Sequence, residues 1–128
     1  MIVLNSKFTY IGIRVKDLDK SVSFYTKFLG MKVKARSKIE QTKGETVGLE
    51  SEDGGFVLEL NYYENNSPYY KDYDAGEGLD HLAFNVDDLS KALEEARASG
   101  YRVISEMKAD GSRWAYVEDP NGIWIELF

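Results

Sequence analysis

The stretch that decides the fold is "YIGIRVKDLDKSVSFYTKFLGMKV", residues 10–33, because the chain returns to the same pattern in "HLAFNVDDLSKALEEARASGYRV", residues 81–103. Each copy opens with alternating apolar residues, which are typical of a strand, and continues with apolar residues at helical spacing. An aspartate precedes each predicted helix as a capping residue, and a glycine follows it. The pattern therefore predicts two related strand–helix units.

Further strands follow each predicted helix. After the first helix, "MKVKARSK" alternates apolar and basic residues and is predicted to be a half-exposed strand, residues 31–38. Two more strands are expected at about 43–50 and 55–62, separated by the turn sequence "SEDGG". Each unit is thus expected to run strand, helix and three strands.

The segment "YENNSPYYKDYDAGEG", residues 63–78, breaks this pattern. Its Tyr, Asn, Gly and acidic residues predict a linker loop, and loops of this length without secondary structure are often functional. We expect a first module at 1–62 and a second module at 79–128. Because only two copies are present, we expect a paired structure with pseudo-twofold symmetry within one compact domain rather than a solenoid.

Composition and charge exclude several classes of protein. With 128 residues, 43% of them hydrophobic and 13% aromatic, the chain is not disordered and is long enough to bury a core. The absence of cysteine excludes disulfides and thiolate chemistry, and the net charge of −6 argues against nucleic-acid binding. No apolar run approaches the ~20 residues of a membrane span. The start "MIVLNSKF" lacks the features of a signal peptide, so we expect a cytoplasmic protein without a membrane partner.

Two apolar strands each carry a glutamate, in "FVLEL" (56–60) and "WIELF" (124–128). A buried carboxylate without a partner is costly, so something is expected to compensate it. By strand alternation, each glutamate lies opposite the apolar face that packs on a helix. The repeat puts four side chains at equivalent places, and they would converge in one cavity if the sheets curl: Tyr10, Glu59, His81 and Glu126.

His81 is the only histidine of the chain. Imidazole and carboxylate ligands together suit a divalent first-row metal such as Mn, Fe, Co, Ni or Zn, and a cation would neutralise the glutamates. Taken singly, the histidine could be a hydrogen-bonded structural residue, and each glutamate could lie on the solvated face of a sheet. Their matching positions in two units favour a metal site.

Four stretches carry a family resemblance: residues 13–33, "VLELNYY" (57–63), "DHLAFNVDDL" (80–89) and "AYVEDPNGIWIELF" (115–128). Together they identify the chain as a member of the vicinal oxygen chelate superfamily, and it most resembles the glyoxalase I family within it. The resemblance implies an α+β fold of two βαβββ modules that form an open, incomplete barrel. It also implies a homodimer, often with each metal site shared between subunits.

The resemblance also implies a ligand set for one divalent metal (Ni, Co, Zn, Mn or Fe). Three of the four family ligands carry over as Glu59, His81 and Glu126, whereas Tyr10 replaces the first histidine. Tyr10 is then a weak fourth ligand, or the site holds its metal with three protein ligands, or it has lost the metal.

Three further residues are expected to contact the substrate. Arg14 matches an arginine that contacts the glutathione part of the substrate, and Tyr63 stands where a glutathione-contacting asparagine is expected. Trp124 and the linker 63–78 are expected to wall the pocket, although dimer packing would explain their aromatic residues equally well.

The implied reaction is the metal-dependent isomerisation of a thiol hemithioacetal of methylglyoxal through an enediolate, with Glu126 as the general base. Two alternatives stay open on the sequence. One is another metal-dependent enzyme of the superfamily, such as an epimerase or a thiol transferase that opens an epoxide antibiotic. The other is a metal-free, drug-binding resistance protein.

Overall fold

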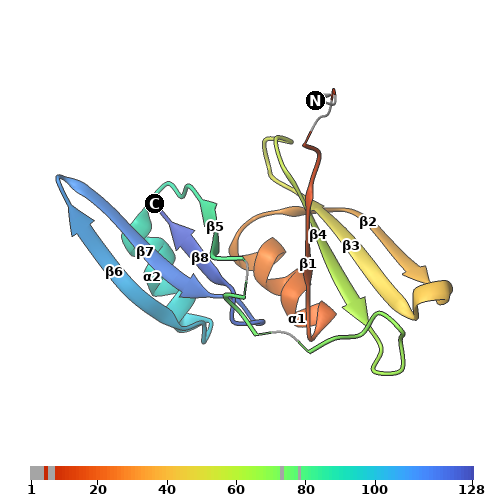
Figure 1. Ribbon diagram of the computed structural model, residues 1–128. Coiled ribbons are helices and arrows are strands. Elements are labelled where there is room, and N and C mark those ends of the chain that lie inside the picture. The colour runs from red at the N-terminus through yellow and green to blue at the C-terminus, as the bar shows by residue number, and fades with distance from the viewer. Residues whose placement is uncertain (1–4, 6–7, 73, 78) are drawn as a thin grey trace.

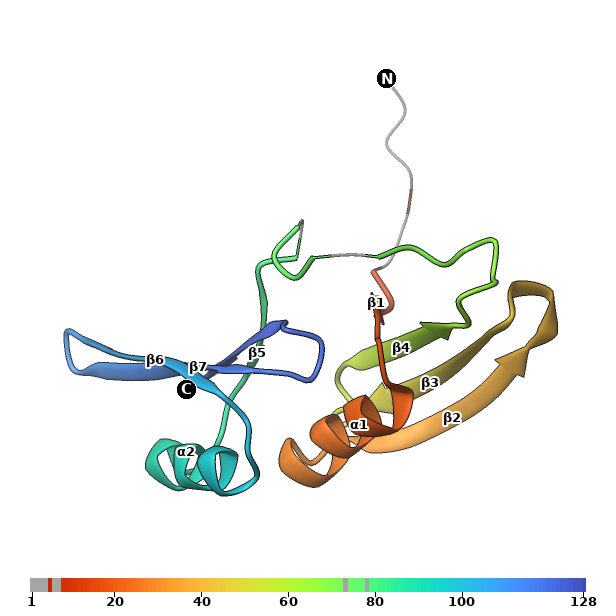
Figure 2. The same ribbon diagram turned by 90° about the horizontal axis from the view of Figure 1, so that it is seen from below.

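A computed structural model describes residues 5, 8–72, 74–77 and 79–128 of the chain. It contains two four-stranded sheets, ordered β1-β4-β3-β2 and β5-β8-β7-β6, each with a helix on one face (Figures 1 and 2). This confirms the predicted α+β class with two βαβββ modules, and neither sheet closes into a barrel. Most of "MIVLNSKF", on which the expected absence of a signal peptide depends, lies outside the described residues.

The first module follows the predicted order closely. Asp17 caps its helix by accepting a hydrogen bond from the backbone N of Lys20 at 3.0 Å. Gly30 ends the helical segment with a φ of 76°, a conformation that glycine adopts without strain. The elements are β1 (Ile11–Arg14), α1 (Leu18–Ser23), the π-helical turn η1 (Phe24–Phe28), β2 (Lys32–Ile39), the short helix η2 (Glu40–Thr42), β3 (Gly44–Glu50) and β4 (Val57–Tyr63).

The second module repeats this order after the linker. Asp88 caps its helix through the backbone N of Lys91 at 3.0 Å. Asp110 and Gly111, with φ of 50° and 80°, form the tight turn of the last long hairpin. The elements are β5 (His81–Phe84), α2 (Leu89–Ala98), β6 (Val103–Ala109), β7 (Ser112–Glu118) and β8 (Trp124–Leu127). No helix in the described part of the chain is long and apolar enough to cross a membrane.

The strand register shows the pseudo-twofold relation between the modules. Gly12 of β1 pairs with Glu59 of β4, and Ala83 of β5 pairs with Glu126 of β8 in the same parallel arrangement. Both outer hairpins also carry a register shift near the glutamate row, between Val33 and Ala35 in β2 and between Val103 and Ser105 in β6. The two glutamates therefore occupy equivalent places in two equivalent sheets.

Each sheet buries the face that the alternation predicts. The buried strand residues face the helix side of each module: Ile13, Val47, Leu49, Leu58 and Leu60 in the first, and Ala115, Val117, Ile125 and Leu127 in the second. The prediction that residues 31–38 form a half-exposed strand is wrong in its burial, since β2 is exposed along its whole length. It is the outermost strand of its sheet, where charged residues discourage edge-to-edge pairing.

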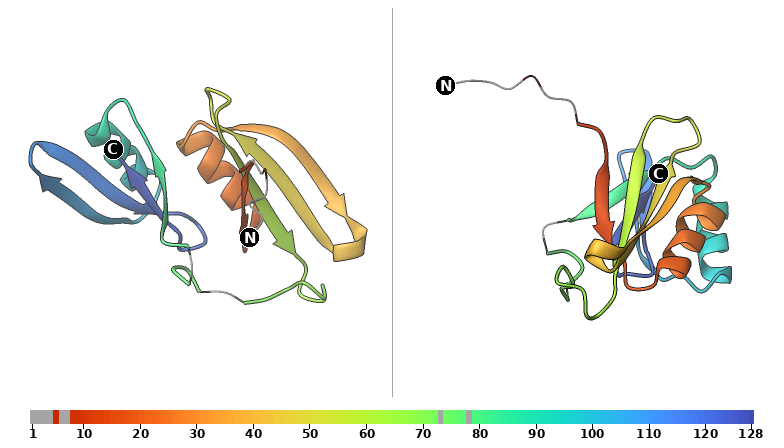
Figure 3. Two further views of the ribbon diagram at one scale, coloured as in Figure 1. Left: turned by 45° about the horizontal axis from the view of Figure 1, so that its top comes forward. Right: turned by 90° about the vertical axis from the view of Figure 1, so that its right-hand side faces the viewer.

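A buried polar cluster joins the two modules. The hydroxyl of Tyr25 in η1 donates to Asp119 Oδ2 at 2.7 Å, and Asn121 Nδ2 donates to Ser21 Oγ at 3.1 Å. The ring of Tyr101 also packs on Phe24 with centroids 4.7 Å apart. These contacts hold the first helix against the second module, so the sheets lie side by side with both helices on the same side of them (Figures 2 and 3).

Candidate functional site

The second module brings two of the predicted ligands together on its open face, the face away from α2. His81 begins β5 and Glu126 lies in β8, and His81 Nε2 is 3.4 Å from Glu126 Oε1. The other ring nitrogen, Nδ1, is 2.6 Å from Asp80 Oδ1. The side chains of His81 and Glu126 are 32% and 23% exposed, so both are half-buried.

This arrangement orients the imidazole toward a ligand. When Nδ1–H donates to the Asp80 carboxylate, Nε2 of the neutral ring is an acceptor that faces a second acceptor, Glu126 Oε1. Two acceptors at this distance need a proton or a cation between them. A carboxylate that orients a histidine in this way is common around metal sites, and the nitrogen and oxygen donors suit a divalent first-row metal. The chemistry of this pair therefore fits the metal that the resemblance implies.

Two aromatic side chains border the pair. The hydroxyl of Tyr116 in β7 donates to Glu126 Oε1 at 3.2 Å, and the His81 ring packs edge-on against the Tyr116 ring with centroids 5.5 Å apart. Trp124, which is 44% exposed, also packs on the Tyr116 ring, with centroids 5.6 Å apart. Desolvation and, next, the hydrogen bond to Glu126 raise the pKa of the Tyr116 phenol above its usual value near 10.

The first module carries the other two predicted ligands. Glu59 lies half-buried in β4, with Gly12 and Gly48 as its cross-strand neighbours. Tyr10 immediately precedes β1 and is 52% exposed. This sheet is separate from the one that holds His81, as Figure 1 shows.

The expected convergence of all four side chains in one cavity is therefore wrong for a single chain. Among the described residues, no group of three or more His, Cys, Asp or Glu side chains is arranged to hold a metal ion. Glu59 and His81 belong to two separate sheets, and the polar cluster around Asp119 joins the modules on their helix side, away from the faces that carry these residues. The expectation that the glutamates are enclosed is also wrong, because Glu59 and Glu126 are both half-buried.

A pocket lies at the end of β1 and β4, in the module that carries Glu59 and Tyr10. Arg14 Nη1 donates to the backbone O of Tyr69 at 2.7 Å, and its guanidinium carbon is 4.8 Å from the centroid of the Tyr63 ring. This cation–π contact and the hydrogen bond hold Arg14 at the pocket wall. The pocket has a volume of about 430 Å³, and it includes both residues that the sequence assigned to thiol recognition in the first module, Arg14 and Tyr63.

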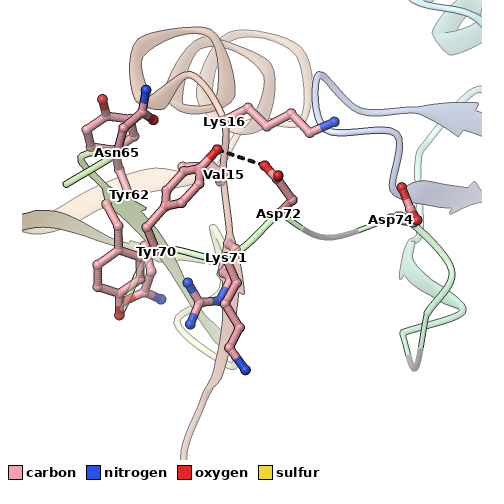
Figure 4. A pocket seen from close by; sticks show the side chains of 11 residues that line it. Val15, Lys16, Tyr62, Asn65, Tyr70, Lys71, Asp72 and Asp74 are labelled. Atoms are coloured by element: carbon pink, nitrogen blue, oxygen red, sulfur yellow. Dashed lines mark hydrogen bonds between the residues drawn. The ribbon is translucent and has the colours of Figure 1, made fainter. Parts of the chain in front are cut away.

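The linker forms much of the same pocket. It contributes Asn65, Tyr70, Lys71, Asp72 and Asp74. Figure 4 shows Tyr70 and Asp72 pointing toward one another, joined by a hydrogen bond of 2.8 Å, while Asp74 lies apart from the other labelled side chains. Trp124, which was expected to wall the same pocket, instead lies in the second module against Tyr116.

Sequence reasoning missed two residues that contact the His81–Glu126 pair. Asp80 directly precedes His81, so its proximity to the ring is a local signal that the sequence contained. Tyr116 is different: its contact with Glu126 depends on the register between β7 and β8, which pairs these two residues across ten positions of sequence. No local pattern of residues predicts that register.

Comparison with known proteins identifies the family. Residues 7–127 match the model of the Glyoxalase/Bleomycin resistance protein/Dioxygenase superfamily. A lactoylglutathione lyase of Arabidopsis thaliana is 38% identical over 96% of this chain, and the chain spans 44% of that protein's length. A lactoylglutathione lyase of Salmonella typhimurium is 37% identical over 90% of this chain and 86% of its own length.

A solved structure supports the same assignment. The trypanothione-dependent glyoxalase I of Leishmania major is similar with a TM-score of 0.76 and 33% identity, over 96% of this chain and 86% of that one. Fold, matched residues and identity over most of the chain agree. The chain therefore belongs to the Glyoxalase/Bleomycin resistance protein/Dioxygenase superfamily.

Proposed function

We propose that the chain is a glyoxalase I-like lyase that isomerises the hemithioacetal of methylglyoxal and a thiol through an enediolate. The observation that carries this proposal is the His81–Glu126 pair, in which two acceptors face one another on an open sheet face. Relatives named lactoylglutathione lyase and glyoxalase I, at 33–38% identity, support the choice of reaction within the superfamily.

A complete site requires a homodimer in this proposal. One chain offers His81 and Glu126 from its second module, and Glu59 and Tyr10 from its first, on separate sheets. When the first module of one chain meets the second module of another, the two halves form one ligand set. The Arabidopsis thaliana relative supports this pairing, because it is more than twice as long as the part that this chain matches and so has room for two such units.

The residues present fit one divalent metal, which Glu59, His81 and Glu126 would hold, with Tyr10 as a fourth ligand or none. When bound, such a metal supplies Lewis acidity that polarises the substrate carbonyl. Asp80 keeps the Nε2 lone pair of His81 directed at the site by accepting the Nδ1 proton. The donor set suits Ni, Co, Zn, Mn or Fe.

Glu126 is the proposed general base. It takes the proton from the carbon that bears the sulfur and the hydroxyl; the electron pair of that C–H bond forms the carbon–carbon double bond of the enediolate, and the carbonyl π electrons move onto the carbonyl oxygen. Glu126 returns the proton to the adjacent carbon, while the hydroxyl proton passes to that oxygen and the carbon that bears the sulfur becomes the thioester carbonyl. The product is the thioester of a 2-hydroxy acid, so no atoms are gained or lost. The half-buried position of Glu126 beside Tyr116 and His81 limits the water that competes for its proton.

Arg14 is proposed to bind an anionic group on the thiol part of the substrate. It lies two residues along β1 from Gly12, which pairs with Glu59, so the two positions are about 7 Å apart along the strand. A substrate held at Glu59 therefore extends its thiol part toward the pocket that Arg14 and Tyr63 border. Tyr63 holds the guanidinium of Arg14 by stacking under it.

The proposal is tested with untagged protein loaded separately with Ni, Co, Zn, Mn or Fe. We expect about one metal per site, and isomerisation of the glutathione hemithioacetal followed by thioester absorbance. Glu126→Gln should lower kcat at least ~100-fold. Glu94→Gln on the exposed surface of α2 is the matched control and should leave kcat unchanged.

Two outcomes contradict the proposal. Metal binding without turnover of any hemithioacetal would favour an epimerase or a thiol transferase acting on an epoxide. Protein that binds none of these metals would favour the metal-free, drug-binding alternative.

A further inference from the structure

We infer that Tyr116 is a positioning residue, whose hydroxyl holds one oxygen of Glu126 and so determines which carboxylate oxygen the site presents. This inference rests on the proposed function, because it assigns Glu126 a role in the metal site and in proton transfer. It concerns a contact that only the folded chain creates, between the middle of β7 and the middle of β8.

Two aromatic contacts hold the ring of Tyr116, independently of its hydroxyl. The imidazole of His81 packs edge-on against it at an interplanar angle of 83°, and Trp124 packs at 53° on the neighbouring strand. Because these contacts fix the ring, the hydroxyl has a defined position, from which it donates to Glu126 Oε1 at 3.2 Å.

Both contacts to the Glu126 carboxylate fall on the same oxygen. Oε1 accepts from Tyr116 and also lies 3.4 Å from His81 Nε2, whereas no hydrogen bond to Oε2 occurs among the described residues. A carboxylate engaged through one oxygen cannot rotate without losing that contact. Tyr116 therefore holds Oε1 in place opposite His81 Nε2, where a cation would bind both, and leaves Oε2 without a hydrogen bond among the described residues.

The first module provides an internal comparison. Gly48 of β3 pairs with Glu59, as Tyr116 of β7 pairs with Glu126, so Gly48 and Tyr116 occupy equivalent positions. A β-carbon built on Gly48 would meet no atom within 4 Å, so the fold leaves the space over Glu59 open. The first module thus has no side chain at this position, and the second module has a tyrosine that contacts its glutamate. The two matching glutamates are thus held differently.

The test compares Tyr116→Phe with the unchanged protein by titration with Co²⁺, followed by its visible absorption spectrum. The variant keeps the ring contacts and loses only the hydroxyl. We expect Co²⁺ affinity to fall about 10- to 100-fold, as for other residues that orient metal ligands, with an altered spectrum. At saturating metal, kcat should fall while KM stays unchanged, because Tyr116 orients the base without touching the substrate.

Tyr101→Phe is the matched control, since it removes the hydroxyl of a tyrosine whose ring packs on Phe24 and Phe28 away from the site. Both variants should remain fully folded at the assay temperature, as judged by circular dichroism, which separates positioning from general stability.

Glu126→Gln distinguishes failure of the inference from failure of the proposed function. If Glu126→Gln loses Co²⁺ while Tyr116→Phe keeps the affinity, spectrum and kcat of the unchanged protein, the inference is wrong and the metal site stands. The proposed site is wrong, and the inference is overturned with it, in either of two cases. In the first, Glu126→Gln binds Co²⁺ as tightly as the unchanged protein. In the second, the unchanged protein itself does not bind Co²⁺.

Discussion

Removal of one hydroxyl at the junction of the modules, by Tyr25→Phe, should destabilise the whole protein. Tyr25 is fully buried, and its hydroxyl donates to Asp119 Oδ2 at 2.7 Å, where Asp119 is itself only 4% exposed. The phenylalanine would keep the edge-on contact with Phe24, whose ring centroid lies 5.0 Å away. The substitution therefore tests a buried hydrogen bond that joins residues 94 positions apart.

The size of the effect follows from the charge and burial of the acceptor. A hydrogen bond to a charged group contributes about 1.5–3 kcal/mol to the free energy of unfolding. Asp119 keeps hydrogen bonds from the backbone N of Asn121 and Ile123 and from Asn121 Nδ2, so its charge is not left unsolvated and the loss stays within that range. With an unfolding entropy of about 2.1 cal/mol/K per residue, this corresponds to roughly 6–11 °C in Tm.

Urea and thermal denaturation, followed by far-UV and near-UV circular dichroism, measure the effect. Tyr101→Phe is again the matched control, and it should cost less than about 0.5 kcal/mol, because it removes a hydroxyl without a hydrogen bond among the described residues. Equal losses for Tyr25→Phe and Tyr101→Phe would refute the reasoning. A transition that separates into two steps would show instead that the cluster couples the unfolding of the modules.

Three further predictions test the helix caps, the core and the site. Asp17→Ala removes the capping bond to the backbone N of Lys20 and should cost about 1 kcal/mol in urea denaturation, and a cost near zero would contradict the capping role. Leu49→Ala, at a fully buried position of β3, should cost about 2–5 kcal/mol by the same measurement, whereas a change below 1 kcal/mol would mean that the core refills the space. The pKa of Tyr116 is raised in the folded protein, first by desolvation, so its phenol contributes stability that is complete below the unfolded pKa near 10 and is lost as pH rises through the folded pKa. Tyrosine ionisation is followed by ultraviolet absorbance as pH rises, in the unchanged protein and in Tyr116→Phe. The difference between the two curves should show one phenol that ionises above pH ~10, and ionisation below that pH would contradict the raised pKa.

Local chemistry made the fold predictable from the sequence. Asp17 and Asp88 cap helices because the backbone N–H groups in the first turn of a helix have no partner within the helix. A carboxylate just before the helix accepts a hydrogen bond from one of them. Alternation along β4 and β8 placed Glu59 and Glu126 on the face away from the helices, because side chains alternate along a strand. The sequence placed His81 and Glu126 in one module, whereas the adjacency of their strands β5 and β8 came from the structure.

The sequence by itself determined two strand–helix modules, the direction of each strand face and the residue types that a metal site needs, because these depend on neighbours a few positions apart. Only the tertiary structure decided that Glu59 stays on a separate sheet from His81. The hydrogen bond between Tyr25 and Asp119, which helps to join the two modules, links residues 94 positions apart and leaves no periodic signal in the sequence. The contact between Tyr116 and Glu126 was decided in the same way, since the register of two strands depends on the packing of their whole sheet.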